Sequence, residues 1–132
     1  HLLEHISSPI EISEEFTRVA SDISSCGPAF LCYFVQQFIE AAHQEIGMDH
    51  GEATRLASEM VLGTGKLLTE GGFTPETLQD RVRVPGGITA EGLELMSIEL
   101  DGLFHRLIQT THKKYYDELN KVETLFYSTR VD

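Results

Sequence analysis

The segment Val82–Met96 constrains this chain most, because it joins two helical patterns through the turn Pro85-Gly86-Gly87. Proline disfavours helical backbone in the residue before it, so we expect the incoming helix to stop at Val84. The two glycines permit positive φ angles and leave no side chain between the backbone and a ligand. Thr89 is then a suitable N-cap for a helix that begins at Ala90.

Two interpretations of this turn stay open from the local sequence. A glycine turn ahead of a helix gathers free backbone N–H groups at the positive end of the helix dipole, which suits a carboxylate or a phosphate. Turns of proline and glycine also occur at ordinary corners between helices. The turn therefore indicates a place that favours anions, without requiring one.

The chain is acidic and has the size of one domain. Its 132 residues are 41% hydrophobic, and a chain of this length buries about two-thirds of its unfolded surface. Ten Lys and Arg against 21 Asp and Glu give a formal charge of −11, which repels nucleic acids and anionic membranes. No apolar run approaches the ~18 residues of a membrane span. We expect neither a nucleic acid nor a membrane as a partner.

The chain begins without an initiator methionine and without the basic and apolar stretches of a signal peptide. We therefore expect it to be a fragment of a longer protein. Cys26 and Cys32 are not spaced as C-x-x-C, and one pair does not make a disulfide framework. We expect both cysteines to be reduced and the protein to be cytoplasmic.

Apolar residues recur at helical spacing along most of the chain, and no stretch shows the sustained alternation of a strand. The run Leu31–Val35 is apolar nearly all round, so we expect it to be buried on most sides. Glycine and proline predict breaks at Ser24–Pro28, Gly47, Gly71-Gly72 and Gly102, and Thr74-Pro75 predicts a capped helix start.

The sequence predicts an all-α fold of five or six helices, of which the last runs from Leu103 to about Tyr127. Residues 1–12, which include Pro9, are predicted to be a linker. Residues 13–132 are predicted to form the helical domain.

Two nucleotide-binding patterns are incomplete. Gly63-Thr64-Gly65-Lys66 is only part of a phosphate loop, because Met60 and Leu67 stand where the motif needs Gly and Ser or Thr. No Gly-x-Gly-x-x-Gly follows a strand, so the chain is expected to have no dinucleotide site of its own.

Other reactive residues lack partners in sequence. His105 and His112 share one helix face, and a helix stop separates His43 from His50. A zinc site needs three or four converging ligands, so solvated histidines are the simpler interpretation. The run Ser24–Cys26 has no base beside it that would activate a nucleophile. We predict no catalytic residue, no cofactor site and no metal site in this chain.

Three stretches together resemble the pyrroline-5-carboxylate reductase family, in both order and spacing. Ser24-Ser25-Cys26-Gly27-Pro28-Ala29-Phe30 is similar to the family's Ser-Gly-Ser-Gly-Pro-Ala-Tyr. Val61–Leu68 is similar to Val-Leu-Gly-Ala-Ala-Lys-Met-Leu. The run from Leu78 to Thr89 resembles the signature Leu-x-Asp-x-Val-Thr-Ser-Pro-Gly-Gly-Thr-Thr. The resemblance covers about residues 10–120 and only the C-terminal half of the family.

The resemblance implies a fold, a cofactor and a partner. Family members join an N-terminal Rossmann domain, which binds NADPH or NADH, to a helical bundle of the 6-phosphogluconate dehydrogenase C-terminal-like type. The helical domain interlocks with its twin, which implies an intertwined homodimer here and leaves a higher oligomer open. The implied cofactor, NADP or NAD, would belong to a Rossmann domain absent from this chain.

The resemblance also implies site residues. In the family, the Pro-Gly-Gly-x-Thr turn holds the carboxylate of the pyrroline ring. This implies backbone contacts to the substrate from Gly86, Gly87 and Ile88, and a hydroxyl contact from Thr89. Ser21 falls where many members have a threonine near the substrate. The implied ligand is a small cyclic imino acid or another small carboxylate.

The implied reaction is the NAD(P)H-dependent reduction of 1-pyrroline-5-carboxylate to L-proline, for which this chain alone is expected to be inactive. The sequence departs from the signature, because Arg83-Val84 replaces Thr-Ser before the proline and Cys26 replaces a serine. These departures resemble divergent relatives such as the late-competence proteins of the ComER type. Two hypotheses follow: a domain of a proline-forming reductase, or a non-catalytic sensor of small carboxylates or assembly protein.

Overall fold

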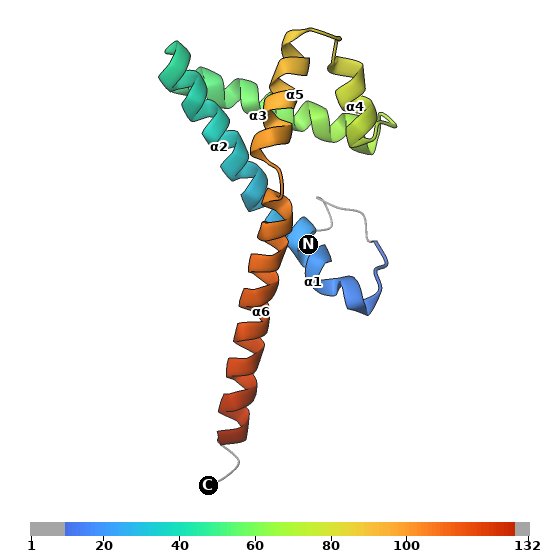
Figure 1. The fold of residues 1–132 in the computed structure, drawn as a ribbon, viewed down its shortest axis with the longest axis vertical. Coiled ribbons are helices and arrows are strands. Elements are labelled where there is room, and N and C mark those ends of the chain that lie inside the picture. Colours follow the sequence, from blue (N-terminus) through green and yellow to red (C-terminus); the bar gives the residue numbers. More distant parts are fainter. Residues whose placement is uncertain (1–9, 129–132) are drawn as a thin grey trace. The chain divides into compact units, whose positions relative to one another are not determined.

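The computed structural model describes residues 10–128, and every regular element in that range is helical. In chain order the elements, labelled in Figure 1, are η2 (Glu14–Phe16), α1 (Thr17–Ser21), η3 (Asp22–Cys26), α2 (Gly27–Ile46), α3 (His50–Thr69), α4 (Pro75–Val82), α5 (Ile88–Glu99) and α6 (Leu103–Ser128). η2 is a 3₁₀ turn, and η3 is a π-helical segment. The predicted all-α fold is confirmed.

The helices group into two compact units. The first unit contains residues 10–28 and 102–128, and so combines η2, α1 and η3 with α6. The second contains residues 29–101, with most of α2 and all of α3, α4 and α5. The predicted linker lies partly outside the described residues, which begin at Ile10; Ile10–Ile12 is exposed and has no regular structure. No helix of residues 10–128 combines the length and apolar composition needed to cross a membrane.

In the first unit, α1 packs against α6. The predicted break at Ser24–Pro28 is wrong, because the chain passes through the π-helical η3 directly into α2. Proline lacks an N–H donor, and its ring crowds the carbonyl four residues earlier. A π turn shifts the hydrogen-bond register by one residue and so relieves this conflict. Pro28 therefore lies in the first turn of α2 without ending the helical path.

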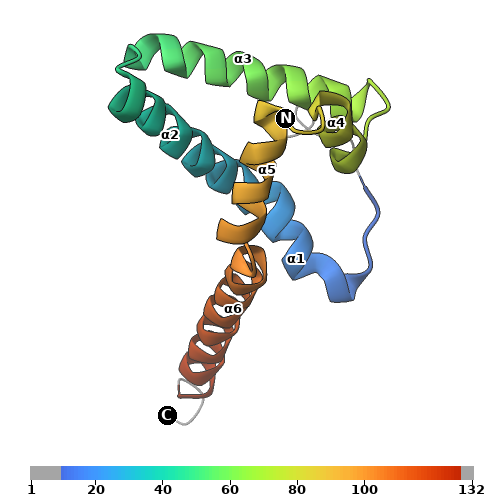
Figure 2. The ribbon, with the colours of Figure 1, turned by 45° about the horizontal axis from the view of Figure 1, so that its top comes forward.

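In the second unit, α2 and α3 meet at a sharp corner, which both views of the ribbon show (Figures 1 and 2). Gly47 ends α2 as predicted, with a φ of +76° and an N–H that donates to the His43 carbonyl at 2.9 Å. Asp49 caps α3 by accepting from the Glu52 N–H at 3.0 Å. Beside the corner the two helices form an open apolar groove of about 240 Å³.

The groove contains the apolar core of the described residues, and that core is small. Ile39 (7% exposed) and Ala53 (5%) are the buried apolar side chains among residues 10–128. The prediction that Leu31–Val35 is buried on most sides is wrong for the single chain, since Leu31 is 47% exposed and Tyr33 is 65% exposed. One copy of the chain therefore leaves many of its large apolar side chains exposed to water.

The predicted breaks at Gly72 and Gly102 and the predicted capped helix start at Thr74-Pro75 are confirmed. Gly72 adopts a φ of +73° after α3, and Gly102 a φ of +66° before α6. Thr74 caps α4 reciprocally with Thr77, because each side chain accepts from the other's backbone N–H, at 3.2 and 2.9 Å. Pro75 occupies the first turn, where its missing N–H costs nothing.

The Thr74 cap gives a stability prediction. Thr74→Ala removes an acceptor for the Thr77 N–H and should lower the free energy of unfolding by about 1 kcal/mol. Thr124→Ala is the matched control, because the Thr124 hydroxyl bonds only the carbonyl one turn earlier in α6 and alanine favours the helix interior. Denaturant unfolding of both variants measures the difference. Equal stabilities would show that the cap does not hold α4.

Candidate functional site

The turn between α4 and α5 is tight and depends on both glycines. The Gly87 N–H donates to the Val84 carbonyl at 2.8 Å and closes the turn. Gly86 has a φ of +69°, which a side chain would strain. Gly87 has an ordinary φ of −90°, but a Cβ there would lie 3.0 Å from the Val84 oxygen and 3.3 Å from its Cβ. Gly86 is therefore required by conformation and Gly87 by space.

The start of α5 differs from the prediction. The helix begins at Ile88, so Gly87 occupies the N-cap position and Thr89 is the second helical residue. The Thr89 side chain does not cap the helix, and the predicted cap is wrong. The reason is that Gly87 is already extended, with a ψ of 171°, and its carbonyl accepts from the Ala90 N–H at 3.0 Å.

Two backbone donors are left free at this end of α5. The N–H groups of Ile88 and Thr89 precede the first intrahelical acceptor. Neither donates to a carbonyl within residues 10–128. The Gly87 N–H, by contrast, is taken by Val84. The arrangement can therefore offer an anion two adjacent amides, with the bare α-carbon of Gly87 beside them.

Arg83, Val84 and Ile88 determine the charge and polarity around the turn. Arg83 Nη2 donates to Asp80 Oδ1 at 2.8 Å, so the guanidinium is paired on its own side of the turn. Val84 is 65% exposed and Ile88 is 94% exposed, which leaves aliphatic side chains in water beside the free amides. The positive charge at this end of α5 thus comes from the helix dipole and the N–H groups.

The structure brings together four of the five predicted site residues. Gly86, Gly87, Ile88 and Thr89 are consecutive in the turn, in the second unit. Ser21 is the last residue of α1, half-buried, in the first unit. That these five residues form one site remains a prediction, and so does the role of each residue.

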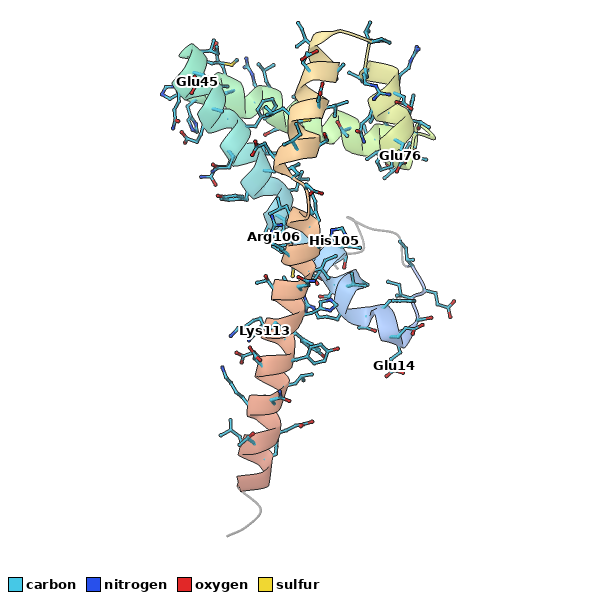
Figure 3. All side chains as sticks on the ribbon, viewed as in Figure 1. Glu14, Glu45, Glu76, His105, Arg106 and Lys113 are labelled. Atoms are coloured by element: carbon cyan, nitrogen blue, oxygen red, sulfur yellow. The ribbon has the colours of Figure 1, made fainter. Side chains whose placement is uncertain are left out.

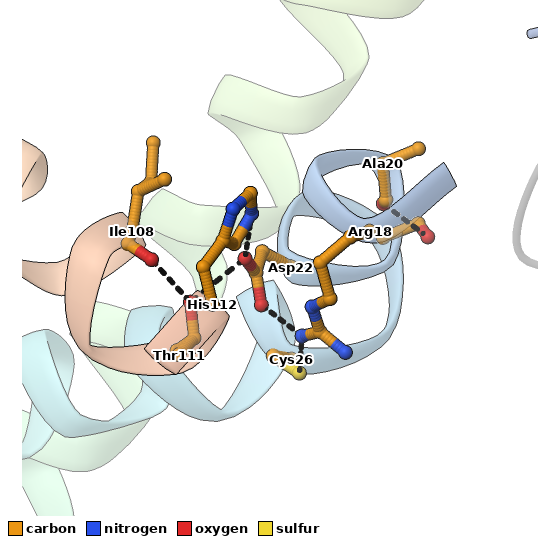
Figure 4. A network of polar contacts seen from close by, with 8 residues as sticks. Arg18, Ala20, Asp22, Cys26, Ile108, Thr111 and His112 are labelled. Carbon is orange, nitrogen blue, oxygen red and sulfur yellow. Dashed lines mark hydrogen bonds and ion pairs between the residues drawn. The ribbon is translucent and has the colours of Figure 1, made fainter. Parts of the chain in front are cut away.

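Beside Ser21 lies a polar cluster that sequence reasoning missed (Figure 4). Asp22 is 5% exposed and is the buried charged residue of the described chain. Its carboxylate accepts from Arg18 Nη2 and, at 2.8 Å, from Thr111 Oγ1, and it lies 3.4 Å from His112 Nε2. The cluster joins η3 to α6 across 89 residues of sequence.

The Arg18 side chain organises the α1 side of this cluster. Its guanidinium carbon lies 5.4 Å from the centre of the Tyr115 ring, and Nη2 is 3.8 Å from the Cys26 sulfur. The hydrogen bond from Arg18 holds the pKa of Asp22 below its usual value, against the opposing effect of burial and with help from Thr111. Arg18 and Asp22 are four residues apart, a spacing that brings opposite charges together on one helix face, so the sequence could have indicated this pair. Nothing in the local sequence indicates Thr111 as a partner.

The predicted solvated histidines have structural partners. His43 and His50 lie close together at the α2–α3 corner, with ring centres 6.0 Å apart. His43 Nδ1 donates to the Met48 carbonyl at 2.8 Å, and His50 Nε2 is 3.2 Å from Glu40 Oε1. In the described part of the chain, no three His, Cys, Asp or Glu side chains converge to hold a metal ion. His105 and the acids Glu14, Glu45 and Glu76 are spread over separate helices (Figure 3).

The Asp22 cluster predicts a pH dependence. Because the folded pKa of Asp22 is lowered, its ionised form stabilises the fold above the unfolded pKa of about 3.9, and this contribution is lost as pH falls through the lower folded value. Thermal unfolding between pH 6 and pH 2 should show a steeper loss of stability for the native chain than for Asp22→Asn. Asp117→Asn, which alters an exposed pair with Lys113, should keep the native profile. An unchanged profile in Asp22→Asn would contradict the assignment.

Comparison with known proteins agrees with this architecture. The family model described as pyrroline-5-carboxylate reductase dimerisation matches residues 14–117. ComE operon protein 4 of Bacillus subtilis is 43% identical over 126 residues, which cover 96% of this chain and 46% of that protein. Pyrroline-5-carboxylate reductase 3 of Mus musculus is 35% identical over 96 residues, 73% of this chain and 35% of the relative.

A solved structure shows the same fold. The crystal structure of Plasmodium falciparum pyrroline carboxylate reductase with NADP bound superposes with a TM-score of 0.70 at 25% identity, over 80% of this chain and 42% of that one. The chain thus spans less than half the length of these relatives. The resemblance seen in the sequence motifs is confirmed: the chain belongs to the pyrroline-5-carboxylate reductase family and carries its dimerisation domain.

Proposed function

We propose that residues 13–132 form the dimerisation and substrate-binding domain of a protein that reduces 1-pyrroline-5-carboxylate to L-proline with NAD(P)H. Residues 1–12 would link it to a nucleotide-binding Rossmann domain. The observation that carries the proposal is the Gly86–Thr89 turn, which presents two free amides within the stretch that resembles the family signature.

In this proposal the turn binds the substrate carboxylate. The N–H groups of Ile88 and Thr89 donate to its oxygens, and the dipole of the twelve-residue α5 favours the negative charge. Gly87 lets the ligand approach the backbone, because a side chain there has no room. The exposed Thr89 also supplies a hydroxyl group. Each of these groups binds and orients the ligand rather than reacting with it.

The cofactor would be held by another part of the whole protein. A Rossmann site needs a strand, a glycine-rich turn and a helix N-terminus in succession. Residues 10–128 contain no strand, so this proposal places the Rossmann site outside them. We therefore assign no step of hydride transfer to this chain.

We also propose that the domain functions as a homodimer in the cytoplasm. Large apolar side chains of α2 are exposed in one copy, including Leu31, Tyr33 and Phe38. Interfaces of obligate homodimers often bury more than ~2,000 Å² and resemble a core cut in half. Cys26 and Cys32 are both free thiols in the structure, as a reducing compartment would keep them. Any larger assembly would be built from this dimer.

The carboxylate site is tested by titrating the domain with L-proline and following the backbone amide signals by NMR. The largest shifts should fall on Gly86–Ala90, with weak affinity because half of the proposed active site is missing. Gly87→Val should abolish them, since its side chain would collide with Val84. Gly92→Val is the matched control, because a Cβ at Gly92 meets nothing within 4 Å. Shifts that centre elsewhere would show that the site is wrongly placed.

A second candidate function is a non-catalytic sensor of small carboxylates or an assembly protein. It is favoured by the higher identity to ComE operon protein 4, 43% over 96% of the chain, than to the reductases. Arg83-Val84 also departs from the Thr-Ser of the family signature beside the turn. Such a protein would keep the turn, bind its ligand and lack turnover.

Turnover of 1-pyrroline-5-carboxylate by the whole protein separates the two functions. We expect slow but measurable turnover, and a rise of at most about tenfold in the double variant Arg83→Thr, Val84→Ser, because one regained hydrogen bond is worth roughly 0.5–1.5 kcal/mol. Turnover below detection in both proteins, with proline binding intact, would favour the sensor. An unchanged, measurable rate would show that these two positions do not explain the divergence.

A further inference from the structure

We propose that the apolar groove between α2 and α3 receives one face of α5 from a second copy of the chain. The inference rests on the proposed homodimer, and it names the surfaces through which the two copies meet. The groove and α5 belong to the same compact unit, residues 29–101.

The groove has the size and lining of a surface that packs against apolar side chains. It is lined by the buried Ile39 and Ala53 and by the exposed Phe38, Leu56 and Met60, together with further apolar residues. An apolar cavity of about 150 Å³ holds a benzene ring, so a groove of about 240 Å³ has room for more than one aliphatic side chain. Among the described residues, α2, the corner after it and α3 line the groove, so the α5 of the same chain leaves it open.

The lining suits a protein side chain better than a metabolite. Sites for small ligands place a few polar groups among apolar walls, and these polar groups orient the ligand. Every side chain that lines this groove is apolar. The carbonyl of Met48, which is one of the lining residues, is already 2.8 Å from His43 Nδ1. A carboxylate ligand would therefore find no partner in the groove.

The helix α5 has apolar side chains on two opposite faces. Helical spacing places Ala90 and Leu93 on one face, where both are half-buried within the chain. Ile88, Leu95 and Ile98 lie on the opposite face and are 94%, 61% and 66% exposed. A helix that is apolar all round is normally buried on all sides. One copy of the chain covers the first face in part, so the second face needs another surface.

A second copy fits as the occupant because each copy carries both the groove and the exposed α5 face. A twofold dimer would therefore make the same contact twice. A fully covered Leu, Ile or Phe side chain removes on the order of 100 Å² of apolar surface from water. Three side chains of the groove and three of α5 at each contact would together bury on the order of 1,000 Å², where specific interfaces begin. The family model that matches residues 14–117, which include both surfaces, is a dimerisation model.

The test is complementation between two variants of the whole protein, followed by sedimentation. Leu56→Lys places a charge in the groove, and Leu95→Glu places one on the α5 face. Each variant alone should raise the dimer Kd at least a hundredfold, because an unpaired charge would be buried at both contacts. An equimolar mixture should recover a dimer, since the lysine of one groove meets the glutamate of the α5 that enters it and the other contact is native.

Two controls make the result specific. Ser58→Lys changes an exposed position on the side of α3 away from the groove, so it should keep the native Kd. Leu56→Lys mixed with Leu56→Glu should stay monomeric, because the two charges lie in different grooves. Recovery of a dimer in that mixture would show that the grooves face each other, and it would overturn the inference.

The remaining outcomes separate this inference from the proposed homodimer. A native protein that sediments as a monomer would contradict both. A native dimer that neither Leu56→Lys nor Leu95→Glu weakens, or a mixture of these two that stays monomeric, would overturn the inference and keep the homodimer. If the single variants do not fold, the two are co-expressed: a folded heterodimer supports the inference, and its absence overturns it.

Discussion

The shortage of internal burial is the constraint on which the rest of this structure depends. Ile39 and Ala53 are the buried apolar side chains of the described residues, although large apolar side chains project from α2 through α6. Ordering each residue costs roughly 1–2 kcal/mol of backbone entropy, against a gain of about 25 cal/mol for each Å² of apolar surface removed from water. Isolated helices are marginal in water. The helices of this domain therefore need cover that one copy does not provide, which agrees with membership of a dimerisation family.

Local order in the single chain comes instead from polar interactions. Asp22 ties η3 to α6 through Arg18 and Thr111. Capping by Asp49 and Thr74 fixes where α3 and α4 begin. These contacts set the course of the backbone on either side of the exposed apolar faces. The Gly86–Thr89 turn has the same origin, since Gly86 and Gly87 shape it without any apolar packing.

The sequence could predict what local chemistry decides. Gly47, Gly72 and Gly102 end or separate helices as expected, because positive φ angles of 66° to 76° suit glycine. Gly86–Thr89 could be grouped because these residues are consecutive. The start of α5 was missed by two residues, because the carbonyl of Gly87 can accept the first helical bonds as readily as Thr89 could cap them.

What the sequence could not show depends on distant partners. The bond from Thr111 to Asp22 joins residues 89 apart. The predicted break at Ser24–Pro28 failed because a π turn can absorb a proline, and no residue pattern announces that turn. The apolar pattern of Leu31–Val35 predicted that these side chains are buried. The described part of the chain leaves most of them exposed, so the residues that cover them must come from elsewhere.

The most direct measurement is the thermal unfolding temperature of the domain across a hundredfold range of chain concentration. A fold completed by a second copy gains stability by mass action, so the unfolding temperature should rise steadily with concentration in a single transition. Sedimentation at each concentration would report the dimer in parallel, near twice the 14.8 kDa of one chain. A folded monomer with an unfolding temperature independent of concentration would contradict the claim that the exposed apolar faces are covered by a twin.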